Sequence, residues 1–370
     1  MKVAMHVDGV EVRGSERQTL LIATGLRERG HTVVVSCRGG GAVEAAFRAA
    51  GFATTSVRPR GDADLLSGLG FAAWLRRERP DAVLLTSWVR LFGASLAARA
   101  ARVPRIVLRV GGVQRVPAGS PSKWKYRRAL LRQIDAMVVN SPGLADGFRA
   151  QLPELAPHLR IVPNAVVHTP AAPAPVRAEV GAAQGDLLLL SVGGLERRKG
   201  LDLLIPAFAR LPDAGVRLLL AGSGPAAERL AALAAEHGVA DRVHFLGQRT
   251  DVPALLAAAD AFVLSSLEDS MANAMLEAMA AALPVLATDV PGTEQALAPR
   301  DGRPAAGWMV PRADEDALAR GLGALVAALR DDPAEARARA AEARWRTEHW
   351  FGPAAMVDEY ERALIGRSGE

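Results

Sequence analysis

The chain has little of what would indicate a secreted or membrane-spanning protein. Its 370 residues include a single cysteine, Cys37, which excludes a disulfide framework and fits a reducing compartment. No apolar run approaches the roughly 20 residues that a membrane-spanning helix needs. The first residues, Met1 to Val7, indicate a short strand and not a signal peptide. We therefore expect a soluble, cytoplasmic protein.

Lysine and aromatic residues are also scarce. Lysine stands only at positions 2, 123, 125 and 199, so nearly all of the 45 basic residues are arginine. Aromatic residues make up 5% of the chain, and no nucleic-acid-binding motif accompanies the net charge of +5. We interpret the arginine excess as a bias of composition and expect no nucleic-acid partner. A basic protein of this kind can still favour an anionic membrane surface.

Strand-like runs alternate with helical stretches along the chain, and this pattern is interrupted once. In the first half, runs such as Val3–Val7 and Ala82–Thr86 are separated by helical stretches such as Arg17–Arg29. The Pro/Ala-rich segment Thr169–Gly185 predicts a linker, after which the alternation restarts at Asp186–Val192. This pattern predicts an α/β protein with two doubly wound, Rossmann-like domains that face each other across a cleft.

The most informative stretch is residues 265–289. The acidic pair Glu268–Asp269 ends a strand-like run, a short turn opens a helix that contains Glu277, and Leu283–Pro284 end that helix before another strand. Parallel α/β sheets bind ligands at the carboxyl ends of their strands, and the N–H groups at a helix start suit a diphosphate. Two carboxylates beside such a site can hold sugar hydroxyls. The stretch therefore predicts a nucleotide-sugar site, although acids eight residues apart also occur on ordinary amphipathic helices.

The same stretch resembles the Glu-x7-Glu motif of retaining glycosyltransferases of family 4, which have the GT-B fold. Asp269 would be the first acid of the motif and Glu277 the second. The resemblance implies that Glu277 holds the ribose hydroxyls of the donor and that Asp269, one methylene shorter than the usual Glu, contacts the donor sugar. It also implies that the backbone amides of the intervening turn cradle the phosphate. These residues are Ser270, Met271, Ala272 and Asn273.

A second resemblance lies in the loop from Gly194 to Lys199, which corresponds to a Gly-Arg-Leu…Lys-Gly loop of the family. It implies that Lys199 offsets the charge that the departing diphosphate gains. Because the chain uses arginine at nearly every other basic position, the lysine at this position indicates that a compact point charge is required here. The alternative is that Lys199 is a solvated surface residue. Gly194 stands where the family usually has Arg, so we expect Arg197 or Arg198 to reach the phosphates instead.

Two further loops resemble family features. The resemblance places the backbone at Gln248 and Arg249 against the nucleobase, and it places Gly14 and Ser15, before the first long helix, near the donor phosphates. An ordinary turn capped by Ser15 is the alternative for the second loop. The family histidine after the fourth strand is absent; Arg109 occupies this region, where it could bind the acceptor or a phosphate.

The resemblance extends over nearly the whole chain. It implies an enzyme that moves a sugar from a nucleotide donor, most commonly UDP-linked, to a hydroxyl of a glycan or lipid-linked acceptor, with retention of configuration and without a metal or other cofactor. It also implies an acceptor-binding domain at 1–168, a linker at 169–185, a nucleotide-sugar-binding domain at 186–350, and a C-terminal helix at 351–370 that packs back on the first domain.

Alternatives remain at this point. The departures at Arg13, Gly194, Asp269 and Gln295, together with the missing histidine, are compatible with a degenerate, non-catalytic GT-B protein that binds nucleotide or a partner transferase. A GT-B nucleotide-sugar epimerase is a further alternative, whereas the absence of a G-x-G-x-x-G fingerprint disfavours a nicotinamide enzyme. Finally, the basic helix predicted over Ser120–Ile134 either rests on an anionic membrane or is a helix with a solvated basic face.

Overall fold

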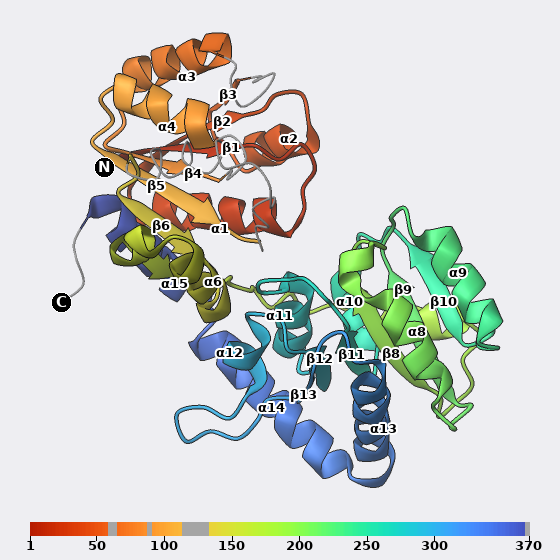
Figure 1. The fold of residues 1–370 in the computed structure, drawn as a ribbon. Coiled ribbons are helices and arrows are strands. Elements are labelled where there is room, and N and C mark those ends of the chain that lie inside the picture. Colours follow the sequence, from red (N-terminus) through yellow and green to blue (C-terminus); the bar gives the residue numbers. More distant parts are fainter. Residues whose placement is uncertain (58–64, 87–90, 113–132, 367–370) are drawn as a thin grey trace. The chain divides into compact units, whose positions relative to one another are not determined.

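The computed structural model describes residues 1–57, 65–86, 91–112 and 133–366 (Figure 1). The described chain divides into two compact units. Unit 1 comprises residues 1–164 and 353–370, and unit 2 comprises residues 165–352. No helix within the described ranges is long and apolar enough to cross a membrane. The helix expected over Ser120–Ile134 lies outside the described residues, apart from its last two positions.

Unit 1 is built around a seven-stranded parallel sheet in the order β3-β2-β1-β4-β5-β6-β7. Its strands are β1 (Lys2–Val7), β2 (Thr32–Cys37), β3 (Thr54–Ser56), β4 (Ala82–Leu85), β5 (Arg105–Val110), β6 (Ala136–Val139) and β7 (Leu159–Ile161). Its helices are α1 (Gly14–Glu28), α2 (Ala42–Ala49), α3 (Leu65–Glu78), α4 (Leu91–Ala100), α6 (Pro142–Gln151), the 3-10 helix η1 (Pro153–His158) and α15 (Pro353–Ile365).

Unit 2 repeats this architecture with a six-stranded parallel sheet in the order β10-β9-β8-β11-β12-β13. Its strands are β8 (Leu187–Val192), β9 (Val216–Ala221), β10 (Val243–Gly247), β11 (Ala261–Leu264), β12 (Val285–Thr288) and β13 (Trp308–Val310). Its helices are α7 (Val176–Glu179), η2 (Arg197–Lys199), α8 (Leu201–Ala209), α9 (Ala227–Glu236), α10 (Val252–Ala258), α11 (Asn273–Ala280), α12 (Thr293–Leu297), α13 (Glu315–Asp331) and α14 (Pro333–His349). The prediction of two doubly wound, Rossmann-like units is confirmed.

The central strands form because their side chains are apolar on both faces, as parallel sheets require. In β8, Leu188 and Leu190 pack into one core with α10, α11 and α14, whereas Leu189 packs into the other core with α8, α9 and α13. Side chains cap two of the helix starts: the Ser141 side chain accepts from the Leu144 N–H at α6, and Asp314 accepts from the Ala317 N–H at α13.

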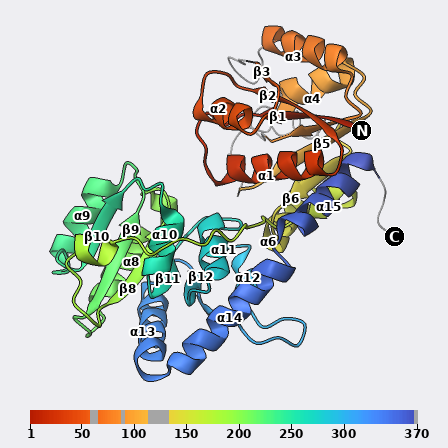
Figure 2. The same cartoon turned by 180° about the vertical axis from the view of Figure 1, so that it is seen from behind.

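The segment expected as a linker lies within unit 2. Val176 in α7 is fully buried in the core beside α11, and the N–H of Ala174 donates to the carbonyl of Ala254 at 2.9 Å. After unit 2, the chain returns to unit 1, where α15 packs against α1, as both views show (Figures 1 and 2). Arg29 and His31 hold this helix through Glu361, at 2.9 and 2.8 Å.

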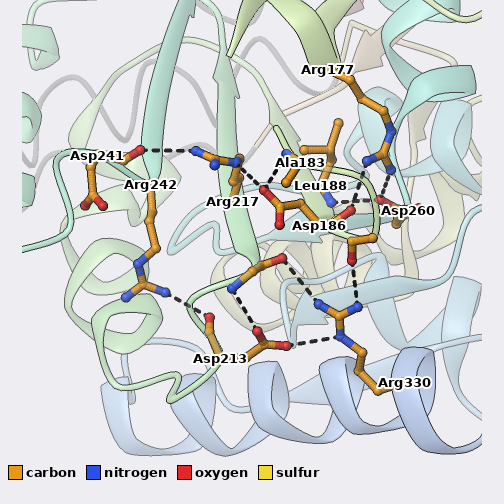
Figure 3. Close-up of polar contacts among 12 residues, drawn as sticks. Arg177, Ala183, Asp186, Leu188, Asp213, Arg217, Asp241, Arg242, Asp260 and Arg330 are labelled. Atoms are coloured by element: carbon orange, nitrogen blue, oxygen red, sulfur yellow. Dashed lines mark hydrogen bonds and ion pairs between the residues drawn. The ribbon is translucent and has the colours of Figure 1, made fainter. Parts of the chain in front are cut away.

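A network of arginine–aspartate pairs lies at the amino ends of the strands in the unit 2 sheet (Figure 3). Arg217 on β9 donates to Asp186 at 2.7 Å, Arg177 on α7 donates to Asp260 at 2.6 Å, and Arg330 on α13 donates to Asp213 at 3.1 Å. These aspartates lie in the segments that lead into β8, β9 and β11, at the amino ends of the strands. The network therefore has a structural role, away from the carboxyl ends where a ligand would bind.

Candidate functional site

The loops after β8 and β11 form a small hollow at the carboxyl edge of the unit 2 sheet. β8 and β11 are neighbours in the sheet, so the two loops meet although 70 residues separate Lys199 from Asp269. The hollow is lined by Ser191, Val192, Gly193, Gly194, Leu195, Lys199, Leu201, Leu220, Leu264, Ser265 and Ser266. The predicted donor residues Gly194 and Lys199 thus line one concave surface.

Lys199 is held by the backbone on both sides. The next residue, Gly200, has a left-handed φ of 62°, and a Cβ there would collide with the carbonyl oxygen of Ser265. The Ser265 hydroxyl in turn donates to the Lys199 carbonyl at 2.9 Å. With its backbone fixed, Lys199 extends its ammonium to the Asp269 carboxylate, where Nζ and Oδ2 are 2.6 Å apart. Each of these two side chains is only 15% exposed.

The turn 270–273 leads into α11 as the sequence predicts. Ala272 occupies the N-cap, and no side chain caps the helix at this position. The N–H of Ser270 donates to the Asp269 carboxylate at 3.0 Å, which orients that side chain beside the helix start. Ser270, Met271 and Ala272 are buried, and Asn273 is half-buried. Because the helix dipole adds positive potential here, the turn suits an anion.

Glu277 is half-buried and lies one turn into α11, on the same helix whose start follows Asp269. Arg197 and Arg198 are exposed on η2. The carbonyl of Arg198 accepts from the N–H groups of Leu267 and Glu268, so its backbone ties the two loops together. Its side chain donates to Glu196 at 2.7 Å.

The loop after β10 reaches the same edge of the sheet. The N–H of Gly222, after β9, donates to the carbonyl of Gly247, and the Ser223 hydroxyl donates to the Gln248 side chain at 3.0 Å. The Arg249 side chain, in contrast, donates to Asp251 and Glu179, and these carboxylates raise its pKa above the ordinary value. Only the backbone of Arg249 therefore stays available for the predicted contact with a base.

Two buried hydroxyls near the site did not emerge from the sequence. Ser266 follows β11, and Thr293 is the first residue of α12; both are fully buried, and neither hydroxyl has a hydrogen-bond partner within the described part of the chain. Ser266 lines the hollow described above. In the sequence, the only indication that these two residues lie near the site was that each one follows a strand.

In unit 1, the structure brings together two of the predicted site residues. Gly14 and Ser15 are the first residues of α1, and Arg109 lies near the end of β5. The Arg109 guanidinium donates to the Ser15 hydroxyl at 3.0 Å and to the Asn164 side chain at 3.4 Å. Ser15 therefore has a partner in Arg109, which the sequence did not reveal.

Comparison with known proteins decides what these two units are. Residues 13–165 match the family model of the glycosyl transferase 4-like domain, and residues 186–328 match that of glycosyl transferases group 1. The lipopolysaccharide core biosynthesis glycosyltransferase LpsE of Rhizobium meliloti is 31% identical over 257 residues, which cover 68% of this chain and 67% of LpsE. The chain belongs to this glycosyltransferase family.

Other relatives and solved structures agree with this assignment. The lipopolysaccharide core biosynthesis glycosyltransferase LpsD of Rhizobium meliloti is 31% identical over 52% of this chain, and the match spans about half (54%) of LpsD. The structure of Anabaena HepE in complex with UDP and glucose superimposes with a TM-score of 0.85 at 19% identity, over 99% of this chain and 100% of HepE. A glycosyltransferase from Rickettsia africae gives 0.84 at 18% identity, over 99% of both chains. These structures show the GT-B fold.

For a glycosyltransferase, the observed arrangement is chemically apt. Glycosyl transfer from a nucleotide sugar needs positive charge at the leaving phosphates and polar groups at the sugar hydroxyls. The carboxyl edge of unit 2 places a lysine, an N-terminal helix turn and three carboxylates, those of Glu268, Asp269 and Glu277, within two loops and one helix. In this enzyme of class 2.4, the residues of unit 2 named above are the candidates for binding the donor. Ser15 and Arg109 are the candidate site residues on unit 1.

Proposed function

We propose that the enzyme transfers a hexosyl unit from a UDP-sugar to a hydroxyl of a glycan or lipid-linked acceptor, with retention of anomeric configuration. The Lys199–Asp269 pair beside the start of α11 is the observation that carries this proposal. It joins a cation for the diphosphate to a carboxylate for the sugar. Support for UDP comes from the HepE structure, and support for a surface-glycan acceptor comes from the two lipopolysaccharide core relatives.

In the proposed reaction, the bond between the sugar and the diphosphate breaks while the acceptor oxygen bonds to the same carbon from the same face. The acceptor proton passes to the departing phosphate, so the scheme needs no histidine base. Lys199, with Arg197 or Arg198, offsets the charge that builds on the diphosphate, and we expect no metal or other cofactor. Glu277 holds the ribose, Asp269 holds the donor sugar, and the amides of residues 270–273 hold the phosphate.

Binding of a panel of nucleoside diphosphates, measured as a shift in the melting temperature, tests the donor assignment. A ligand at a hundred times its dissociation constant stabilises the folded protein by about 2.7 kcal/mol. We expect UDP to raise the melting temperature and Lys199→Ala or Glu277→Ala to remove most of that rise. Glu236→Ala, an exposed acid at the end of α9 in unit 2, is the control. A wild-type protein that is folded but responds to no nucleotide would refute the proposal and favour a non-catalytic protein.

Retention is tested separately by following the sugar product. With UDP-α-glucose as the donor and water as the acceptor, NMR detects which anomer of glucose forms first. The α-anomer is the expected product, and initial formation of the β-anomer would exclude retention. Association with an anionic membrane through residues 120–134 stays a prediction, and binding to vesicles with and without anionic lipid tests it.

A further inference from the structure

Arg109 carries a buried positive charge in unit 1. It lies on β5 and is 3% exposed. Its guanidinium hydrogen-bonds the Ser15 hydroxyl, the Asn164 amide oxygen and the Tyr360 hydroxyl, all of which are neutral groups. No carboxylate among the described residues forms an ion pair with it. Because burying a cation without a counter-charge costs several kcal/mol, Arg109 is an unusual residue for a purely structural role.

The surroundings of Arg109 add to this positive potential. Ser15 is the second residue of α1, a helix of 15 residues, and the first helical hydrogen bond runs from the Arg17 N–H to the Arg13 carbonyl. The N–H groups before Arg17 therefore point out of the helix start, where the dipole is positive. Glu16 accepts from the Arg13 N–H at 3.2 Å, so this carboxylate of the first turn offsets part of the positive potential at the helix start.

The loop that follows β5 lies close against the guanidinium. A Cβ at Gly111 would lie 3.1 Å from Nη1 and 3.3 Å from Nη2 of Arg109, so only a glycine allows this approach without displacing the side chain. Gly14, Ser15, Gly111 and Gly112 are all half-buried and thus reach solvent.

Asn140 provides a second, independent observation. It follows β6, next to β5 in the sheet, and it is 3% exposed. Its amide nitrogen donates to the Gly111 carbonyl at 3.3 Å, which defines the orientation of the amide. The Asn140 oxygen has no partner among the described residues. Since a buried, unpartnered oxygen needs a donor, this position suits a hydroxyl group of a ligand.

We propose that unit 1 binds an acceptor that carries a phosphate or carboxylate group. The anion pairs with Arg109 at the start of α1, and Asn140 accepts a hydrogen bond from a hydroxyl of the same molecule. The inference rests on the proposed function in one respect, namely that unit 1 is the acceptor side of the enzyme. The diphosphate of the donor is the other possible source of the anion, and the experiment separates the two sources.

Isothermal titration of the 370-residue chain tests this site with inorganic phosphate, glucose 6-phosphate, glucose and UDP as separate probes. Two variants remove the site in different ways. Arg109→Gln removes the charge, whereas Ser15→Asp places a carboxylate against the guanidinium and supplies the anion from within the chain. Arg149→Gln, which removes one exposed positive charge on α6, is the matched control.

We expect the wild type and Arg149→Gln to bind phosphate and glucose 6-phosphate, with glucose much weaker. Arg109→Gln should weaken the two anions at least tenfold while UDP affinity stays within twofold, and Ser15→Asp should weaken the two anions to the same extent. Ser15→Asp should also raise the melting temperature because it neutralises a buried charge, so it gives a result even if Arg109→Gln fails to fold.

Unchanged phosphate binding in Ser15→Asp, or equal affinities for glucose and glucose 6-phosphate, would overturn the inference. A tenfold loss of UDP affinity in both variants would assign the anion to the donor and equally overturn the acceptor assignment. If the wild type binds glucose 6-phosphate but not UDP, the donor proposal fails while the anion site stands. The two failures are therefore distinguishable.

Discussion

The ammonium of Lys199 and the carboxylate of Asp269 lie 2.6 Å apart, so the two residues proposed to contact the donor neutralise each other. Both side chains are 15% exposed, which strengthens the attraction relative to a surface pair. A diphosphate that binds at the start of α11 would compete with Asp269 for Lys199. Asp269 would therefore have two opposed effects on the donor. It weakens the contact between Lys199 and the diphosphate, and it binds the donor sugar.

The first prediction separates these two effects. Lys199→Ala should weaken UDP binding about tenfold or more, since a charge-assisted hydrogen bond contributes about 1.5–3 kcal/mol. Asp269→Asn should tighten UDP binding several-fold because it frees the lysine, yet it should lower transfer from UDP-glucose at least a hundredfold. Isothermal titration and a UDP-release assay measure the two quantities.

Lys2 and Glu78 offer a matched control for this pair. Their ion pair in unit 1 has a length of 2.8 Å and shares the charge types of the Lys199–Asp269 pair. Lys2→Ala and Glu78→Gln should leave UDP affinity unchanged. If Asp269→Asn weakens UDP as strongly as Lys199→Ala does, the competition between carboxylate and diphosphate does not exist.

The second prediction concerns the contact between the loops after β8 and β9. Gly222 has a φ of 149°, and a Cβ there would collide with the carbonyl oxygen of Gly193. Gly222→Ala must therefore push the two loops apart, at a cost of about 3 kcal/mol in the free energy of unfolding. It should also weaken UDP binding, because Gly193 lines the hollow beside Lys199.

Gly238 is the control for this substitution. It also has a left-handed φ, 68°, but a Cβ there would meet nothing within 4 Å. Gly238→Ala should cost about 1 kcal/mol from backbone strain alone and leave UDP binding intact. Urea unfolding of both variants gives the comparison, and equal losses in the two would show that the loop contact is not tight.

The third prediction concerns Arg346, which is fully buried on α14. Its guanidinium donates to the carbonyls of Ala296, Ala298 and Pro304 and to Glu342, at 2.6–2.9 Å. Arg346→Met leaves the three carbonyls without this donor, whereas Glu342 keeps its pair with Arg303, so we expect a loss of about 3–5 kcal/mol in the free energy of unfolding.

Arg344 on the same helix is the matched control for Arg346. It forms an exposed pair with Glu348, and Arg344→Ala should cost less than about 0.5 kcal/mol. Circular dichroism during urea unfolding measures both variants. A loss below about 1 kcal/mol in Arg346→Met would mean that water or a rearranged loop satisfies the three carbonyls.

The fold could be predicted from the sequence because buried parallel strands such as β1 and β8 read as continuous apolar runs. The site could be predicted only in part. Asp269 and Glu277 share one local motif, so their placement around α11 followed from short-range sequence. The Lys199–Asp269 pair could not be foreseen in this way, because it depends on which strands are neighbours and on a single backbone turn at Gly200.

The side-chain directions in the loops were also beyond the sequence. The backbone of the loop that contains Arg249 was expected near the base, and the sequence did not indicate that Asp251 and Glu179 hold the Arg249 side chain. Similarly, Ser15 was interpreted as a small residue or a helix cap, whereas it accepts from Arg109, 94 positions away. Pairings of this kind depend on tertiary packing, which local patterns do not encode.

The last prediction concerns the attachment of α15 to unit 1 and its dependence on pH. Hydrogen bonds from His31 and then Arg29 hold the pKa of Glu361 below its ordinary value of 4.5. The carboxylate thus stays charged in the folded state at a pH where it is already protonated in the unfolded chain. Its contribution to stability is complete above about pH 5 and is lost progressively as the pH falls through its folded pKa.

Glu361→Gln should therefore lower the free energy of unfolding at pH 7 and make it less dependent on pH between about 5 and 3. Glu359→Gln, on an exposed surface of the same helix, is the control and should retain the acid dependence of the wild type. Hydrogen exchange of α15 amides, measured at both ends of this range, reports on the helix itself. Because unit 1 is completed by a helix that follows unit 2 in the chain, faster exchange confined to α15 in the Glu361→Gln variant at pH 7 would show that this attachment depends on the carboxylate. Exchange equal to that of the wild type at every pH measured would show that apolar packing of α15 against α1 suffices.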